Sequence, residues 1–138
     1  MIKAVVDPGV LIAGLISSAG VPANIIRAWQ RGVFEMVVSD HLLDELATTL
    51  LRSKFRRWIV EGDAVAFIEI LRLAAIVVDD PVAVERVSRD PDDDYLVALA
   101  RISGASVLVS GDDDLQSIDA ADPPIVSPRR FLTTIESL

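Results

Sequence analysis

Short apolar runs recur along the chain, separated by segments of helical length. The first, KAVVD at residues 3–7, is too continuously apolar to be a half-exposed strand. A strand of this kind is buried on both faces, as the central strands of parallel sheets are. Similar runs occupy residues 34–38, 75–78 and 105–110, with a shorter one at 125–126. We therefore predict an α/β domain with a mostly parallel sheet of four to five strands, covered by helices on both faces.

Helix signals lie between these runs. Pro22 can occupy the first turn of a helix that continues to about Gln30, and Ser39 or Asp40 can cap a helix that carries a stripe of leucines. Further helices are predicted around residues 55–60, 64–73 and 90–104 and after Ser127, and a loop is predicted at residues 120–124. Because no linker, repeat or low-complexity segment divides the sequence, we predict one domain, residues 1–138.

Composition excludes several chemistries. The absence of cysteine excludes disulfides, thiolate catalysis and cysteine-bound zinc, and a single histidine, His41, excludes a histidine-rich metal site. The hydrophobic content of 51% and the mean hydropathy of +0.45 are high for a small protein, so we predict that a homodimer covers part of the surface. Residues 8–26 carry no charge, but prolines and glycines interrupt them. We therefore expect no membrane segment and a cytoplasmic location.

Acidic residues are concentrated in one window. Residues 90–122 contain nine of the 21 acidic residues and only one base, Arg101, so this window accounts for the whole formal charge of −8. Two aspartate triplets, residues 92–94 and 112–114, dominate it. Like charges at this density repel one another unless solvent or a cation compensates them. The window therefore predicts a cation site.

Four carboxylates are predicted to meet at one edge of the sheet. Asp7 ends the first strand and Asp112 follows the fourth, so both lie at the carboxyl edge if these strands are parallel. Asp94 begins the helix before the fourth strand, and Glu45 borders the leucine stripe early in the helix after the second, which places both at the same edge. Oxygen ligands without sulfur or imidazole favour Mg²⁺ or Mn²⁺. Such ions support hydrolysis of phosphodiesters, so we predict this chemistry.

Four segments, in order and spacing, resemble the acidic motifs of the PIN domain family, which includes the small bacterial VapC-like toxins. They read VVDPGVLIAG, SDHLLDEL, SRDPDDDYLVALA and LVSGDDDL, and they extend over nearly the whole chain. The resemblance implies a three-layer α/β/α fold and a metal-dependent ribonuclease. It assigns Asp7, Glu45, Asp94 and Asp112 to a magnesium or manganese site that cleaves RNA. For a toxin of this kind it also implies a cognate antitoxin protein as partner.

The remaining polar residues of these motifs are given different roles. Asp114 looks like the family's auxiliary acid and is taken as a further metal ligand, and Ser110 stands where the family usually has threonine. Asp92 and Asp93 are expected to complement the positive end of a helix, and Asp113 is expected to face solvent.

The first motif departs from the family. Where the family typically has Asp-Thr-Asn, this chain has Asp7-Pro8-Gly9, so a pair of polar side chains is missing beside the site. The departure leaves open a catalytically impaired PIN-fold module that binds RNA or protein. A third hypothesis, a phosphatase or receiver-like domain with Asp7 as phosphate acceptor, lacks the second early acid and the late lysine that such proteins typically need.

A basic segment offers a surface for nucleic acid. The sequence RSKFRRW places Arg52, Lys54, Arg56 and Arg57 within six residues, with two aromatic residues among them. Such a cluster can bind an RNA backbone and stack a base. It can equally be a solvated helix face whose aromatic residues lie in the core or in a dimer interface, and an antitoxin could use the same arginines. Both interpretations stay open at this point.

Overall fold

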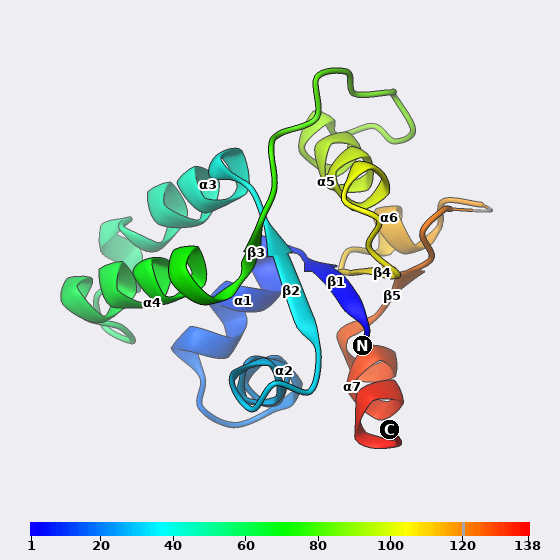
Figure 1. Ribbon diagram of the computed structural model, residues 1–138. Coiled ribbons are helices and arrows are strands. Elements are labelled where there is room, and N and C mark those ends of the chain that lie inside the picture. Colours follow the sequence, from blue (N-terminus) through cyan, green and yellow to red (C-terminus); the bar gives the residue numbers. More distant parts are fainter. Residues whose placement is uncertain (120) are drawn as a thin grey trace.

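The computed structural model describes residues 1–119 and 121–138, and its centre is a five-stranded sheet (Figure 1). All neighbouring strands are parallel, in the order β3-β2-β1-β4-β5. The strands are β1 (Lys3–Val6), β2 (Glu35–Val38), β3 (Ile76–Val77), β4 (Val107–Val109) and β5 (Ile125–Val126). The predicted parallel sheet is therefore confirmed. The loop expected at 120–124 begins at a residue outside the described ones.

Seven α-helices and one 3-10 turn connect the described strands. They are α1 (Pro8–Ile16), α2 (Val21–Gln30), α3 (Asp40–Leu50), η1 (Ser53–Phe55), α4 (Glu61–Ala74), α5 (Pro91–Ile102), α6 (Asp113–Gln116) and α7 (Pro128–Glu136). Side chains of Ser39, Asp90 and Ser127 cap α3, α5 and α7, as short polar residues do at helix starts. The helix predicted at 55–60 is wrong, because only the 3-10 turn and irregular turns occupy this region.

Helix α1 was not predicted, because Pro8 and Gly9 suggested an interrupted segment. Pro8 is instead the first helical residue, where the missing N–H would have no intrahelical partner in any case. Asp7 completes the start of the helix, since its Oδ1 accepts a hydrogen bond of 3.0 Å from the Gly9 amide. The fold thus turns the end of β1 directly into a helix cap.

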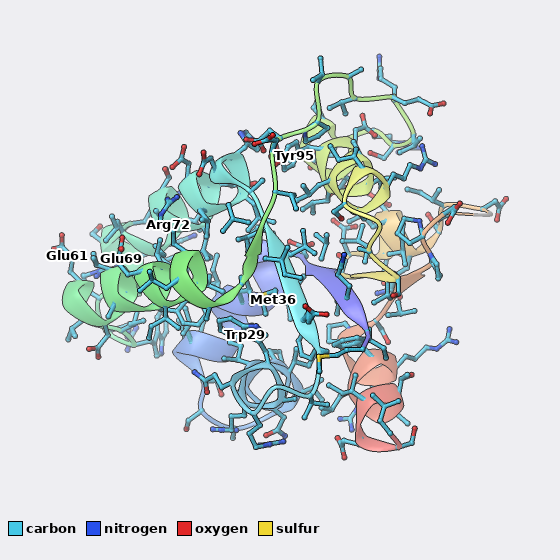
Figure 2. All side chains as sticks on the ribbon, in the orientation of Figure 1. Trp29, Met36, Glu61, Glu69, Arg72 and Tyr95 are labelled. Carbon is cyan, nitrogen blue, oxygen red and sulfur yellow. The ribbon has the colours of Figure 1, made fainter. Side chains whose placement is uncertain are left out.

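The helices lie on both faces of the sheet, which confirms the three-layer architecture. Helix α5 packs against β1 and β4 on one face, and α2 and α7 pack together on the opposite side in Figure 1. Helices α3 and α4 contact each other beside β2 and β3, and in Figure 2 Arg72 extends from α4 toward α3. Val5 at the centre of β1 is fully buried between Val37 and Leu108. A continuously apolar strand in this position explains why no alternation is seen in the sequence.

No single helix in residues 1–119 and 121–138 is long and apolar enough to cross a membrane. Helices α1 and α2 reach the necessary length and hydropathy only as a pair, and the chain bends by 98° between them.

Candidate metal and phosphodiester site

Asp7 and Asp112 meet at the carboxyl edge of the sheet, and Ser110 links them. Asp7 follows β1, while Ser110 and Asp112 follow β4. The Ser110 hydroxyl donates a hydrogen bond of 2.8 Å to Oδ2 of Asp7 and accepts one of 3.1 Å from the backbone amide of Asp112. Ser110 is fully buried, and its position is fixed by backbone pairing to β5 through Val126. The pairing of β1 with β4 sets the register of the two segments, and the Ser110 hydroxyl links Asp7 to the backbone at Asp112.

Asp94 is engaged outside this cluster, in contrast to its predicted role. Its side chain is only 4% exposed, and Oδ1 accepts hydrogen bonds from the amides of Val87 (2.9 Å) and Ser88 (2.8 Å) and from the Ser88 hydroxyl (2.9 Å). Burial raises the pKa of this carboxyl, but these hydrogen bonds outweigh burial and keep the pKa below its ordinary value of 3.8. Asp94 thus anchors the segment that precedes α5, here called the edge loop (residues 78–90).

Asp93, which was expected only to complement the positive end of the helix, interacts electrostatically with Asp7 and Asp112. The side chain is 8% exposed, and burial together with the charges of Asp112, Asp90 and Asp7 raises its pKa to about 6. A shift in this direction is expected when carboxylates approach one another in a poorly solvated site. Asp93, rather than a charge of the helix end alone, therefore belongs to the same electrostatic cluster as Asp7 and Asp112.

Helical phase does not by itself separate Asp93 from Asp94. Asp93 precedes the buried residues Leu96 and Ala100 by three and seven residues, and Asp94 precedes the buried residues Val97 and Ala98 by three and four. The two aspartates differ instead in the distant groups that the fold brings to them.

Glu45 and Asp114 lie at the margins of the cluster. Glu45 is partly buried on α3, and burial, followed by the charge of Asp92 on α5, raises its pKa above the ordinary value of 4.5. Asp7 also contributes to this rise, so Glu45 lies within electrostatic range of the first strand. Asp114 is exposed, and its backbone amide donates a hydrogen bond of 2.8 Å to Oδ1 of Asp112. The side chain of Asp114 adds negative charge near Asp93.

The donor set fits a hard cation only if water completes the coordination. Within residues 1–119 and 121–138, no three acidic or histidine side chains are close enough together to enclose a metal ion by themselves. Burial, followed by the charges of Asp112, Asp90 and Asp7, raises the pKa of Asp93, so negative charge is concentrated at this edge of the sheet. Mg²⁺ and Mn²⁺ are suited to this arrangement because they accept a few carboxylates and retain several waters.

Two hollows open beside the cluster. One, of about 330 Å³, is lined by Asp7, Gly9, Pro22 and Asp112 among others. A Cβ atom added at Gly9 would lie 3.6 Å from Oδ1 of Asp7, so the absence of a side chain here leaves space directly against the carboxylate. The other hollow, of about 400 Å³, runs between α3 and the start of α5 and is lined by Glu45 and Asp92 among others. Open space thus lies against Asp7 and Asp112 on one side and against Glu45 and Asp92 on the other.

A hydrogen-bonded network next to Glu45 was not anticipated from the sequence. The Tyr95 hydroxyl contacts both the Ser39 hydroxyl and Oδ1 of Asp80, and Figure 2 shows Tyr95 near the chain segment that leads from β3 into the edge loop. Burial and the neighbouring Asp80 raise the pKa of Tyr95. Although burial opposes ionisation of Asp80, hydrogen bonds from Tyr95, Ser39 and the His41 amide lower the pKa of its carboxyl. The network joins α5 to the start of α3, the helix that carries Glu45. No periodicity in the sequence connects these segments.

The basic cluster separates into outward and inward members. Lys54 lies 5.1 Å from the centre of the Phe55 ring, and Arg57 lies 5.1 Å from that of Trp58, so these two cations rest on neighbouring aromatic rings. Arg56 is partly buried and donates to the Leu50 carbonyl at the end of α3, which removes it from the candidate RNA-binding set. Its Nε and Nη1 atoms are buried and have no hydrogen-bond partner among the residues that the structure describes.

Arg52 lines the hollow between α3 and α5 and is exposed. Of the four basic residues, it is the one that the structure places beside Glu45 and Asp92 in that hollow.

Comparisons with known proteins agree with this fold. A family model of the PIN domain matches residues 3–114. The uncharacterised protein MJ1680 of Methanocaldococcus jannaschii is 28% identical over 117 residues, which cover 85% of this chain and 75% of that protein. The crystal structure of PAE2754 from Pyrobaculum aerophilum has the same fold, with a TM-score of 0.66 at 16% identity, over 99% of this chain and 91% of that chain.

Proposed function

Because this chain belongs to the PIN domain family, whose members are in general nucleases, we propose that it is a metal-dependent endoribonuclease. The observation that carries this proposal is the cluster of Asp7, Asp93 and Asp112 at the carboxyl edge of the sheet, where α/β domains form their ligand crevices. Burial and the charges of Asp112, Asp90 and Asp7 raise the pKa of Asp93. Carboxylates gathered beside open space in this way are suited to binding a cation and a phosphodiester together.

Asp7, Asp93 and Asp112 would hold Mg²⁺ or Mn²⁺, with Glu45 and Asp114 at the margin. Such an ion, when bound, supplies Lewis acidity and neutralises charge on a phosphodiester under attack. Ser110 orients Asp7 and the backbone at Asp112, because its hydroxyl donates to Oδ2 of Asp7 and accepts from the Asp112 amide. The raised pKa of Glu45 suits its carboxylate to accept a proton from a water molecule at the edge of the hollow.

The impaired binding module is the second candidate, and the Pro8-Gly9 pair is the observation that favours it. Pro8 itself does not argue for an impaired site, because it lies at the first helical position, where a backbone N–H would have no intrahelical partner in any case. Gly9 still offers its backbone amide to Asp7. A Gly9→Asn variant introduces the polar side chain typical of the family into open space. Wild type that binds RNA but cleaves it only after this substitution would support the impaired module.

The cellular role and the assembly are further proposals. The resemblance to VapC-like toxins supports a toxin neutralised by an antitoxin, in the cytoplasm. A homodimer is supported by large apolar side chains that are exposed around η1 and α4, among them Trp58 (53% exposed) and Leu73 (84% exposed).

The enzyme proposal is tested by RNA cleavage with purified protein and Mn²⁺, with Asp93→Asn and Asp94→Asn beside the wild type. We expect Asp93→Asn to reduce kcat at least a hundredfold, because it removes a ligand charge. The kcat of Asp94→Asn should stay within about fivefold of the wild-type value, because an amide oxygen can still accept the hydrogen bonds of the edge loop. Loss of activity in Asp94→Asn with full activity in Asp93→Asn would reverse the assignment of the two residues. No cleavage by wild type with either metal would refute the enzyme.

A further inference from the structure

The edge loop is a long connection that stands beside the carboxylate cluster. It runs from the end of β3 to the start of α5 without a helix or strand, and Figure 1 shows it projecting beyond the sheet above α5. Connections of this length without secondary structure are uncommon in compact domains and are usually functional.

A buried carboxylate fixes the second half of this loop. The three hydrogen bonds to Oδ1 of Asp94 hold Val87 and Ser88 against α5, and the Ser88 hydroxyl also accepts a bond of 3.2 Å from the Asp90 amide. Arg89 therefore lies between two residues whose backbones are held in place. Burying a carboxylate costs free energy unless hydrogen bonds compensate it. Here the backbone and a side chain of the loop supply these bonds, so Asp94 fixes the shape of the loop.

The acidic and basic residues of the edge loop differ in their contacts. Asp80 is bonded to Tyr95, and Glu85 pairs with Arg101 at 3.2 Å. Arg86 and Arg89 are exposed, and neither is in an ion pair within 4.0 Å among the residues that the structure describes, where the pairs are Arg72 with Asp40 and Arg101 with Glu85. Asp80 and Glu85 of the loop are thus engaged within the protein, whereas Arg86 and Arg89 face solvent.

These arginines lie near the start of α5, the helix that carries Asp93. Arg89 directly precedes Asp90, the cap of α5, and the charge of Asp90 acts on both Asp93 and Glu45. The charge of Arg86 acts on Asp94. An edge this acidic repels a polyanion, so an RNA chain needs cations close to the carboxylates in order to approach them. With Arg56 turned inward, the cluster after α3 supplies less of this charge than its sequence suggests.

We propose that Arg86 and Arg89 bind backbone phosphates of single-stranded RNA next to the scissile position, and that Asp94 is the positioning residue that holds them there. The inference rests on the proposed nuclease function and names part of its substrate-binding surface. Guanidinium groups suit this role because they bind phosphate oxygens in a bidentate manner and remain charged at every working pH.

Binding is measured by fluorescence anisotropy with a labelled single-stranded RNA, in an Asp93→Asn background that prevents cleavage, over a series of salt concentrations. Loss of two phosphate contacts should lower the slope of log affinity against log salt by about 1.4, since each contact contributes about 0.7 for single strands. We expect Arg86→Ala/Arg89→Ala to weaken binding about tenfold at moderate salt. Arg31→Ala is the matched control, because Arg31 is an exposed arginine before β2, at the opposite edge of the sheet. It should change affinity less than twofold.

The positioning role has its own readout. Asp94→Ala should weaken RNA binding as the double arginine variant does, and Asp94→Asn should bind RNA as the wild type does. The affinity for Mn²⁺, measured by calorimetry in an otherwise wild-type chain, should change less than twofold in both Asp94 variants. Should Asp94→Ala fail to fold, Ser88→Ala removes one of the same hydrogen bonds and should show a smaller loss of RNA affinity.

Several results would overturn the inference. An unchanged salt slope in Arg86→Ala/Arg89→Ala, an equal loss in Arg31→Ala, absence of RNA binding, or binding of poly-glutamate as tight as that of RNA would each do so. The nuclease proposal fails separately. Wild type that binds RNA through these arginines but does not cleave it with Mn²⁺ would leave the binding surface standing and refute the enzyme.

Discussion

Replacement of Asp93 by asparagine should stabilise the metal-free protein and abolish its response to metal. The carboxyl has a pKa of about 6 in the folded protein against an ordinary value of 3.8, so the folded state holds this proton more tightly than the unfolded state. The wild type is therefore most stable below pH 3.8 with respect to this group, loses stability as pH rises from 3.8 to 6, and changes little above that. At pH 7 the loss is about 3 kcal/mol, at about 1.36 kcal/mol for each pKa unit.

Asparagine does not titrate, so Asp93→Asn should recover about 2–3 kcal/mol of unfolding free energy at pH 7 in EDTA. In a chain of this size the recovery corresponds to a rise in Tm of about 10 °C. Bound Mn²⁺ has the opposite effect, because a ligand at a hundred times its Kd stabilises the folded state by about 2.7 kcal/mol. The wild type should gain this stabilisation, and Asp93→Asn should not.

The assay is thermal unfolding followed by circular dichroism from pH 4.5 to 8, in EDTA and in Mn²⁺. Asp92→Asn is the control, since it removes an equal charge from an exposed residue of the same helical turn and should change stability by about 0.5 kcal/mol or less. The reasoning is refuted if Asp93→Asn is neutral or destabilising in EDTA at pH 7, or if its advantage over wild type does not shrink toward pH 4.5. A full Mn²⁺ response in Asp93→Asn would refute the ligand assignment alone.

Three further outcomes follow from particular contacts. Asp94→Ala should lower the free energy of unfolding by about 3 kcal/mol because three hydrogen bonds to a buried carboxylate are lost, and Asp94→Asn by about 1 kcal/mol, both measured by urea unfolding. Because the pKa of Asp94 is lowered in the folded protein, the carboxylate contributes its full stability above pH 3.8 and loses it as pH falls through the folded pKa. An equal loss of unfolding free energy at acid pH in wild type and Asp94→Asn would contradict this. Ser110→Ala should reduce kcat about tenfold and Ser110→Thr should restore it, whereas equal rates in all three proteins would show that the hydroxyl does not orient Asp7. Leu73→Asp should convert the proposed dimer to a monomer in light scattering, and a monomeric wild type would refute the dimer.

Much of the fold could be predicted because its signals are local. The continuously apolar strand at Lys3–Val6, the serine cap at Ser39 and the leucine stripe of α3 each report on their own segment. Parallel topology then follows from the alternation of strands and helices, since such a connection brings the carboxyl ends of the strands to one edge. The structure differs from the prediction at α1, where Pro8 begins a helix, at the short helix α6, which was not predicted, and around residues 55–60, where the apolar spacing is filled by turns.

The residues of the candidate site were likewise predictable only where their position depends on their own segment. The sequence by itself determined that carboxylates from distant segments reach one sheet edge, because each follows a strand or begins a helix. Only the tertiary structure decided that Asp93 faces that cluster while Asp94 binds the edge loop, that Arg56 turns inward, and that Tyr95 joins Asp80 to Ser39. The physical reason is that a strand's burial is recorded in its own residues, whereas the partner of a carboxylate or a guanidinium depends on which distant backbone the fold brings within about 3 Å of it.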